Sequence, residues 1–176
     1  MTVILPSLVL VLICLLQAGA EVPIQLDFDA EKFAGMWHVA AIVSNCSMFP
    51  KMRDEMKSST ITISFTPEGD LAAKLIWPLV DQCQEFELLF QHSGQAGHYR
   101  GTSQEKKDLH VMETDYGHYA IVHELQYDEE KPQTSLQLLT REQEVTPQLL
   151  HKFEELIPTM GLTMDMLAIL PKSGEC

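Results

Sequence analysis

Apolar and polar side chains alternate along most of this chain with a period of two, the pattern of half-buried β-strands. The clearest run is Ile61, Ile63 and Phe65, which alternate with residues that carry hydroxyl groups. The segment Pro67-Glu68-Gly69-Asp70 follows as a tight turn. The same alternation between turn signals predicts a first strand around Trp37 and then strands over residues 60–66, 71–77, 82–91, 98–101, 108–113, 117–127 and 133–141.

These eight strands follow one another with no helix between them, which predicts an up-and-down antiparallel sheet. Eight strands close into a barrel whose interior holds one small ligand, and closure removes the exposed sheet edges. One helix follows the strands: Thr146 suits an N-cap and Pro147 the first helical turn. Its apolar face is formed by Leu149, Leu150, Phe153, Leu156 and Ile157. We therefore predict an all-β fold, an eight-stranded antiparallel barrel with one C-terminal α-helix packed on its outside, and a segment over residues 166–170 that returns along the wall.

The first twenty residues have the features of a secretory signal. They carry no charged side chain, contain an apolar run over residues 8–16 and end in Ala18-Gly19-Ala20. We expect cleavage after Ala20, which leaves one domain over residues 21–176 of a secreted, extracellular protein. No later apolar run is long enough to cross a bilayer, so membrane insertion is not expected. The net charge of -13 disfavours nucleic acid and anionic lipid as partners.

Three cysteines lie beyond the signal, at Cys46, Cys83 and Cys176. In an oxidising compartment two of them would pair and one would remain free. Cys46 is also the middle residue of Asn45-Cys46-Ser47, a sequon that predicts N-glycosylation of Asn45.

Three short motifs lie in a characteristic order: Gly35-Met36-Trp37, Thr114-Asp115-Tyr116 and Thr140-Arg141. In order and spacing they resemble the three signature regions of the lipocalins, secreted eight-stranded barrels that carry small apolar molecules. The resemblance extends over residues 33–176, and it is closest to the lipocalin-type prostaglandin D synthases and the small secreted lipocalins of reproductive and mucosal fluids. In the family, the motif residues identify the fold and do not touch the ligand.

The resemblance implies several structural roles. Trp37 would lie against the closed end of the barrel with Arg141 packed across its ring, a contact worth about 0.5 to 2 kcal/mol. Cys83 would pair with Cys176, leaving Cys46 as the free thiol. The loop after the first strand would act as a lid over the mouth, and its apolar residues are Met48, Phe49, Met52 and Met56.

The resemblance also implies that the interior of the barrel binds the ligand. Candidate lining residues follow from the alternation along each strand, where an error of one residue exchanges the two faces. They are Val39, Ala41, Val43, Phe86, Leu88, Phe90, Val111, Tyr119, Ile121, Leu136 and Leu138. We expect a carrier of one small hydrophobic molecule such as a fatty acid, a retinoid or a prostaglandin. If Lys74 faced inward, it would favour a ligand with an acidic head group. If it faced outward, it would be a solvated surface residue with no role in binding.

The alternative is a small lipid-modifying enzyme of the prostaglandin D synthase type. The position of the nucleophilic cysteine of that enzyme corresponds to Ser59 in this chain, and a hydroxyl is a far poorer nucleophile than a thiolate. Cys46 could act instead, but it is expected to lie outside the cup, the ligand-binding interior of the barrel. The sequence therefore disfavours an enzyme.

The sequence gives less support to a siderophore ligand, a metal or another cofactor. Siderophore-binding lipocalins use basic residues at positions that approximately match Leu88, Gln126 and Ser135, and none of these is basic. The seven histidines are scattered without metal-ligand spacing on one face, so neither a metal nor another cofactor is expected. A cell-surface receptor is a candidate protein partner, and we expect a monomer.

Overall fold

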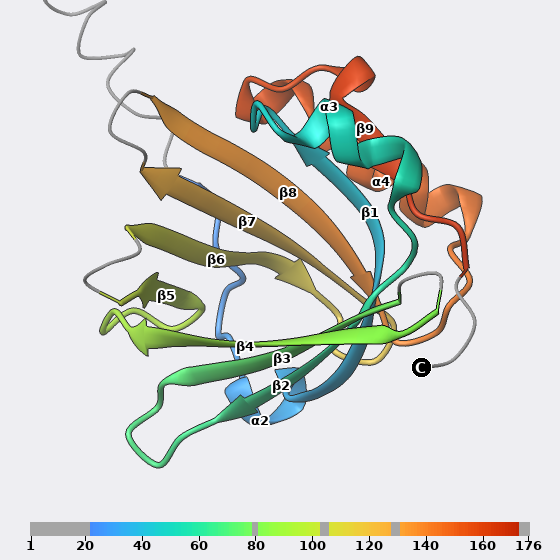
Figure 1. Ribbon diagram of the computed structural model, residues 1–176. Helices are drawn as coiled ribbons and strands as arrows, with labels where there is room; N and C mark the ends of the chain where they lie inside the picture. Colours follow the sequence, from blue (N-terminus) through green and yellow to red (C-terminus); the bar gives the residue numbers. More distant parts are fainter. Residues whose placement is uncertain (1–21, 79–80, 103–105, 128–130, 173–176) are drawn as a thin grey trace, which may run out of the picture.

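The computed structural model of the chain describes residues 22–78, 81–102, 106–127 and 131–172. Its centre is one antiparallel sheet in which each strand pairs with the next in sequence from β2 to β8, and β1 pairs with both β8 and β2 (Figure 1). The sheet therefore closes into the predicted eight-stranded barrel. The strands are β1 Gly35–Ser44, β2 Thr60–Phe65, β3 Leu71–Pro78, β4 Cys83–His92, β5 His98–Gly101, β6 Lys107–Thr114, β7 Tyr119–Tyr127 and β8 Pro132–Thr140.

A ninth strand, β9 (Leu167–Ile169), pairs with the second half of β1 through residues Ala41–Val43. The predicted return of the chain along the wall is confirmed. Because β2 pairs with β1 over Gly35–His38 only, β9 occupies the part of the β1 edge that β2 leaves.

The predicted C-terminal helix is α4, Pro147–Leu156, which lies on the outside of the barrel (Figure 1). Its N-cap is Thr146, whose hydroxyl oxygen accepts a hydrogen bond from the backbone N–H of Leu149 at 3.2 Å. A 3₁₀-helix, η2 (Pro158–Met160), follows, and Gly161 with φ of 72° ends it in the left-handed region that glycine tolerates.

Two separate clusters of buried side chains result. One fills the barrel interior and includes Trp37, Val39 and Val111, while the other lies between the outer wall and α4 and includes Phe153 and Ile157. Side chains of β1, β7 and β8 belong to the second cluster, so the outer faces of these strands also carry buried residues.

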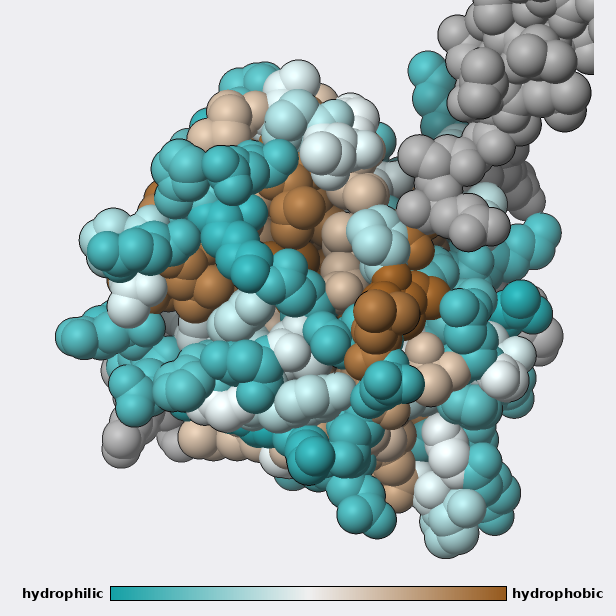
Figure 2. Space-filling view, turned by 180° about the vertical axis from the view of Figure 1, so that it is seen from behind, coloured by the Kyte–Doolittle hydropathy of each residue, from teal (hydrophilic) through white to brown (hydrophobic). Residues whose placement is uncertain are grey.

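The remaining helices are short. α2 (Ala30–Phe33) precedes β1 at the closed end, and α3 (Phe49–Met52) continues into the 3₁₀-helix η1 (Arg53–Glu55) in the loop that follows β1. Among the described residues, no helix is both long and apolar enough to cross a membrane. On the face seen in Figure 2, hydrophilic residues predominate and apolar ones show as separate patches between them.

Cys46 is a free thiol, and Cys83 is disulfide-bonded. Residue 176 lies outside the described residues, so the pairing of Cys83 with Cys176 stays a prediction. The predicted signal over residues 1–20 also lies outside them.

Candidate functional site

The closed end of the barrel is built around Trp37, which is fully buried. The guanidinium carbon of Arg141 lies 3.7 Å from the centre of the indole ring, which confirms the predicted pair. The indole N–H donates to the carbonyl of Phe33 at 2.9 Å. Arg141, directly after β8, also donates to the carbonyls of Tyr116 and Met36 at 2.9 Å and of Lys32 at 3.0 Å, so one side chain joins three segments of the closed end.

The turn between β6 and β7 is held by Asp115. Its carboxylate accepts hydrogen bonds from the backbone N–H groups of His118 at 2.8 Å and Tyr119 at 3.0 Å. Partial burial would raise the pKa of this carboxyl, but these two N–H groups and the His118 ring outweigh burial and lower it. Thr114 and Tyr116 also support the turn, because the Thr114 hydroxyl oxygen accepts from the Tyr116 N–H at 2.9 Å. These motif residues stabilise the closed end of the barrel.

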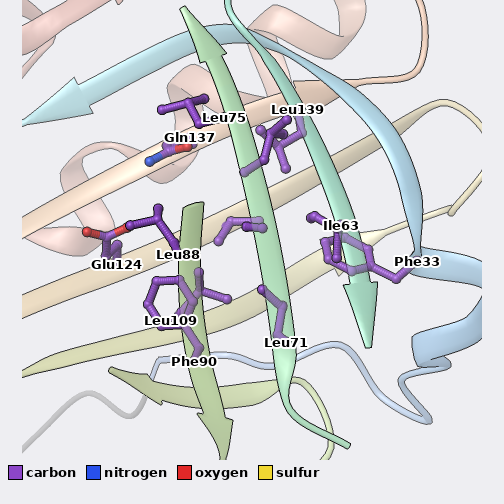
Figure 3. A pocket seen from close by; sticks show the side chains of 13 residues that line it. Phe33, Ile63, Leu71, Leu75, Leu88, Phe90, Leu109, Glu124, Gln137 and Leu139 are labelled. Carbon is purple, nitrogen blue, oxygen red and sulfur yellow. The ribbon is translucent and has the colours of Figure 1, made fainter. Parts of the chain in front are cut away.

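An apolar cavity of about 80 Å³, called the deep cavity below, lies inside the barrel (Figure 3). Side chains from α2 and from β2, β3, β4, β6, β7 and β8 line it: Phe33, Ile61, Ile63, Leu71, Ala73, Leu75, Leu88, Phe90, Leu109, Val122, Glu124, Gln137 and Leu139. Of the predicted lining residues, Leu88 and Phe90 line this cavity. Val39 and Val111 also face the interior, where they pack in the inner cluster.

The set of β1 residues that point into the barrel shifts by one position halfway along the strand. Val39 pairs with Leu139, but Ala41 pairs with Leu138, so a bulge at this point adds one residue to β1. The predictions that Ala41 and Val43 face the cup are therefore wrong: both pack in the outer cluster. Ile42 packs against the inner cluster instead.

The predictions for β7 and β8 are wrong by one residue. Tyr119, Ile121, Leu136 and Leu138 all belong to the outer cluster beneath α4. Their strand neighbours line the cavity instead, namely Val122, Glu124, Gln137 and Leu139. The cup therefore contains the polar side chains Glu124 and Gln137, whereas Ile121, Leu136 and Leu138 pack in the outer cluster.

A larger hollow of about 650 Å³ opens between the loop after β1 and the ends of β3 and β4. The predicted lid residues Met52 and Met56 line it, and so does Phe86, which is 42% exposed. Phe86 pairs with Leu75 of the deep cavity, so the two spaces adjoin along β3 and β4. A hollow of this size lies within the usual range for small-molecule sites, which the deep cavity alone does not reach.

The side of the mouth formed by β1, β7 and β8 is polar. A pocket of about 180 Å³ there is lined by Ser44, Cys46, Glu124, Gln126, Gln133, Thr134 and Ser135. Cys46 also packs against the inner cluster, so the expectation that it lies outside the cup is wrong. The chain turns inward after β1 because the Ser44 hydroxyl accepts from the Cys46 N–H at 3.1 Å, and Asn45 exchanges hydrogen bonds with Thr134.

Side-chain positions bear on two further residues that the sequence analysis singled out. Lys74 faces outward, with its ammonium group 2.8 Å from the Glu85 carboxylate, and it does not contribute to the cup. Asn45 is exposed at the rim, and its glycosylation stays a prediction.

The histidines are not all scattered. His98, His110 and His123 lie opposite one another on neighbouring strands, with ring centres 4.2 Å apart for the first pair and 5.7 Å for the second. Burial lowers the pKa of His123, and burial together with the other two rings lowers that of His110 to about 4. The pairing of β5, β6 and β7 brings these three histidines together, and their spacing in the sequence does not reveal this pairing. No group able to hold a metal ion is found among the described residues.

Comparison with known proteins gives consistent matches. A sequence profile of the Lipocalin / cytosolic fatty-acid binding protein family matches residues 34–174. The chain is 36% identical over 159 residues to human lipocalin-15, covering 90% of this chain and 86% of that protein. It is 31% identical over 170 residues to an extracellular fatty acid-binding protein of Coturnix japonica, covering 97% and 94%, and 28% identical over 171 residues to a prostaglandin-H2 D-isomerase of Equus caballus, covering 91% and 86%.

Two solved structures resemble the whole barrel, and both are described as siderocalins. The siderocalin Ex-FABP, with dual ligand specificities, has a TM-score of 0.74 and 27% identity, covering 82% of this chain and 97% of that one. The siderocalin Q83, with a dual ligand binding mode, has a TM-score of 0.74 and 30% identity, covering 84% and 94%.

Proposed function

This chain belongs to the lipocalin family, whose barrels bind hydrophobic ligands, and we propose that it is a secreted carrier of one small amphiphile. The observation that carries the proposal is the apolar cavity inside the barrel, which adjoins a larger hollow under the lid. The ligand would place its hydrocarbon part against Phe33, Ile63 and Phe90. Removal of apolar surface from water supplies about 25 cal/mol per Å², less the cost of ordering ligand and lid. A fatty acid, a retinoid and a prostaglandin are the candidate ligands of this proposal.

We propose a carrier and not an enzyme. Ser59, at the position of the synthase nucleophile, is buried, and a hydroxyl is a weak nucleophile without an activating base. The remaining candidate is Cys46, which lines the polar pocket at the mouth. A glutathione-dependent turnover assay with a prostaglandin endoperoxide, run on the wild type and on Cys46→Ala, separates the two functions. Turnover that disappears in Cys46→Ala would replace the carrier by the enzyme.

An iron–siderophore complex fits the cup less well. Leu88 lines the deep cavity, and Gln126 and Ser135 line the polar pocket, so the three positions surround the cup without supplying a positive charge. A multiply anionic chelate would lose its hydration against these residues without an ionic partner. We therefore propose an apolar ligand with a single small polar group.

The proposal is tested by titration with retinol and with the neutral fluorescent probe N-phenyl-1-naphthylamine. The decisive variant is Ala73→Phe, since Ala73 is buried and lines the cavity. We expect saturable binding by the wild type and a loss of at least about tenfold in affinity when the added ring fills the cavity.

The matched control is Ala72→Phe. Ala72 precedes Ala73 in β3 and pairs with the exposed Leu89, so its side chain points outward and the affinity should stay within about twofold. Ala73→Val gives a smaller, graded loss and serves if the Phe variant does not fold. Absence of saturable binding by the wild type would overturn the carrier, and equal losses in the Ala72 and Ala73 variants would place the site elsewhere.

A further inference from the structure

The deep cavity and the larger hollow share a wall formed by β3 and β4. On β3, Leu75 lines the deep cavity, and Trp77, which points to the same face two residues further on, lines the hollow. On β4, Leu88 and Phe86 are related in the same way. Figure 3 shows Leu71 and Leu75 spaced along the wall of the deep cavity. From Leu71 to Trp77 the strand rises by about 20 Å, about the length of an extended long-chain fatty acid.

The hollow continues the apolar surface of the deep cavity. Eight described residues line it: Met52, Glu55, Met56, Lys57, Trp77, Pro78, Gln84 and Phe86. Met56 is buried and packs in the inner cluster, so it belongs to both the interior and the mouth. A hydrocarbon chain that leaves the deep cavity therefore stays in contact with apolar side chains until it reaches the polar members of this set.

Lys57 provides the positive charge at the mouth. Among the described residues, it is the one cationic side chain that lines the deep cavity, the hollow or the polar pocket. Lys74 and Lys152 each pair with a glutamate on the protein. Lys57 is exposed and has no ion pair or side-chain hydrogen bond with the described residues. Its ammonium group is therefore open to a ligand.

The backbone next to Lys57 is held against the barrel wall. The Ser58 N–H donates to the carbonyl of Pro171 at 3.0 Å, and the Ser58 hydroxyl donates to the carbonyl of Val39 at 3.0 Å. The carbonyl of Ser59 accepts from the Val39 N–H at 2.9 Å. Because Ser58 and Ser59 are both buried, Lys57 extends into the hollow from a fixed point on β1.

We propose that Lys57 is a specificity-determining residue of the cup, which binds the head group of amphiphiles that end in a carboxylate while their hydrocarbon chain follows β3 and β4 into the deep cavity. The proposal rests on the carrier function and narrows its ligand class to long-chain monocarboxylic acids. An ammonium group donates charge-assisted hydrogen bonds to a carboxylate, which are stronger than those to a neutral hydroxyl. Glu55 also lines the hollow, but no ion pair between described residues joins it to Lys57.

The test compares dodecanoic acid with 1-dodecanol, which has the same hydrocarbon chain. Each displaces N-phenyl-1-naphthylamine from the purified full chain at neutral pH. We expect the acid to bind the wild type at least about threefold more tightly than the alcohol. In Lys57→Gln this preference should disappear through weaker binding of the acid, while the affinity for the alcohol stays within about twofold. Lys57→Arg, which keeps the charge, should keep the preference.

Two variants of the same loop are the matched controls. Lys51→Gln removes the same charge from α3, where Lys51 is exposed and is not among the described residues that line the hollow. Its preference for the acid should equal that of the wild type. Glu55→Gln should leave the acid bound at least as tightly as in the wild type, because it removes a like charge from the hollow.

Three results would overturn the proposal: an acid that binds the wild type no more tightly than the alcohol, a preference that survives in Lys57→Gln, or an acid affinity that either control lowers as much as Lys57→Gln does. If the probe and both ligands fail to bind, the carrier function fails as well. If they bind without dependence on Lys57, the carrier function stands and only the head-group site fails.

Discussion

Arg141 illustrates how much a single side chain contributes at the closed end of this barrel. Its guanidinium group stacks on Trp37, and its three nitrogen atoms donate to backbone carbonyls before β1, at its start and in the turn before β7. A planar fork of donors can satisfy these acceptors together, which a lysine ammonium group cannot. The motif residue is therefore a structural clamp.

Replacement of Arg141 by lysine should lower the free energy of unfolding by about 2 to 4 kcal/mol, since the stacking and most of these hydrogen bonds are lost. Urea denaturation followed by tryptophan fluorescence measures the change. Arg100→Lys is the control, because Arg100 is 64% exposed and its substitution should cost less than about 0.5 kcal/mol. Equal effects of the two substitutions would show that Arg141 is no clamp.

At the scale of single elements, the position of α4 decides which residues of β8 line the cup. Leu138 is fully buried beneath the helix, while the next residue, Leu139, lines the cavity. Both are buried leucines, so neither hydrophobicity nor burial distinguishes their roles. Only the face of the strand does so.

Leu138→Ala and Leu139→Ala should therefore differ in their effects on ligand binding. Each should destabilise the protein by about 2 to 5 kcal/mol, because each removes a buried side chain. Only Leu139→Ala should change the affinity of the folded protein for retinol, by about threefold or more. Chemical denaturation and fluorescence titration measure the two quantities. An affinity change in Leu138→Ala alone would mean that the strand has the opposite register.

For the molecule as a whole, the three neighbouring histidines His98, His110 and His123 predict how stability depends on pH. Burial and the neighbouring rings lower the pKa of His110 to about 4, from an ordinary value of 6.5 in the unfolded chain. The nearby charged groups are Asp108, which lies 3.4 Å from the His98 ring, and Arg100, which pairs with Asp108. Asp108 offsets only part of the effect of burial on His110.

As the pH falls from about 6.5 to 4, the unfolded chain takes up protons that the folded protein does not, so the free energy of unfolding should fall. His110→Gln should flatten this dependence, because one depressed pKa is removed. His151→Gln is the control, as His151 is exposed on α4. Urea denaturation at intervals across this pH range measures the slope. A slope in His110→Gln as steep as that of the wild type would contradict the assignment to His110.

Much of the architecture follows from the amino-acid order alone. The strand β5 has the predicted ends, His98 and Gly101, and the other strands from β2 to β8 differ from their predicted bounds by one or two residues. Thr146 and Pro147 mark the start of α4 as predicted. These features depend on alternation, turns and caps within a few residues of each position, which is why local reasoning is sufficient for them. The Trp37 and Arg141 pair came from the family resemblance.

The identity of the cup wall depends on contacts between distant segments. The bulge after Val39 exchanges the inward and outward faces of β1. In β7 and β8, the more apolar face packs in the outer cluster with α4, and the polar Glu124 and Gln137 line the cavity. Alternation shows that a strand has two unlike faces, but it does not show whether the more apolar face packs against a helix or lines a cavity. That choice is made only when the sheet closes and the helix packs on it, because burial is a property of the assembled layers.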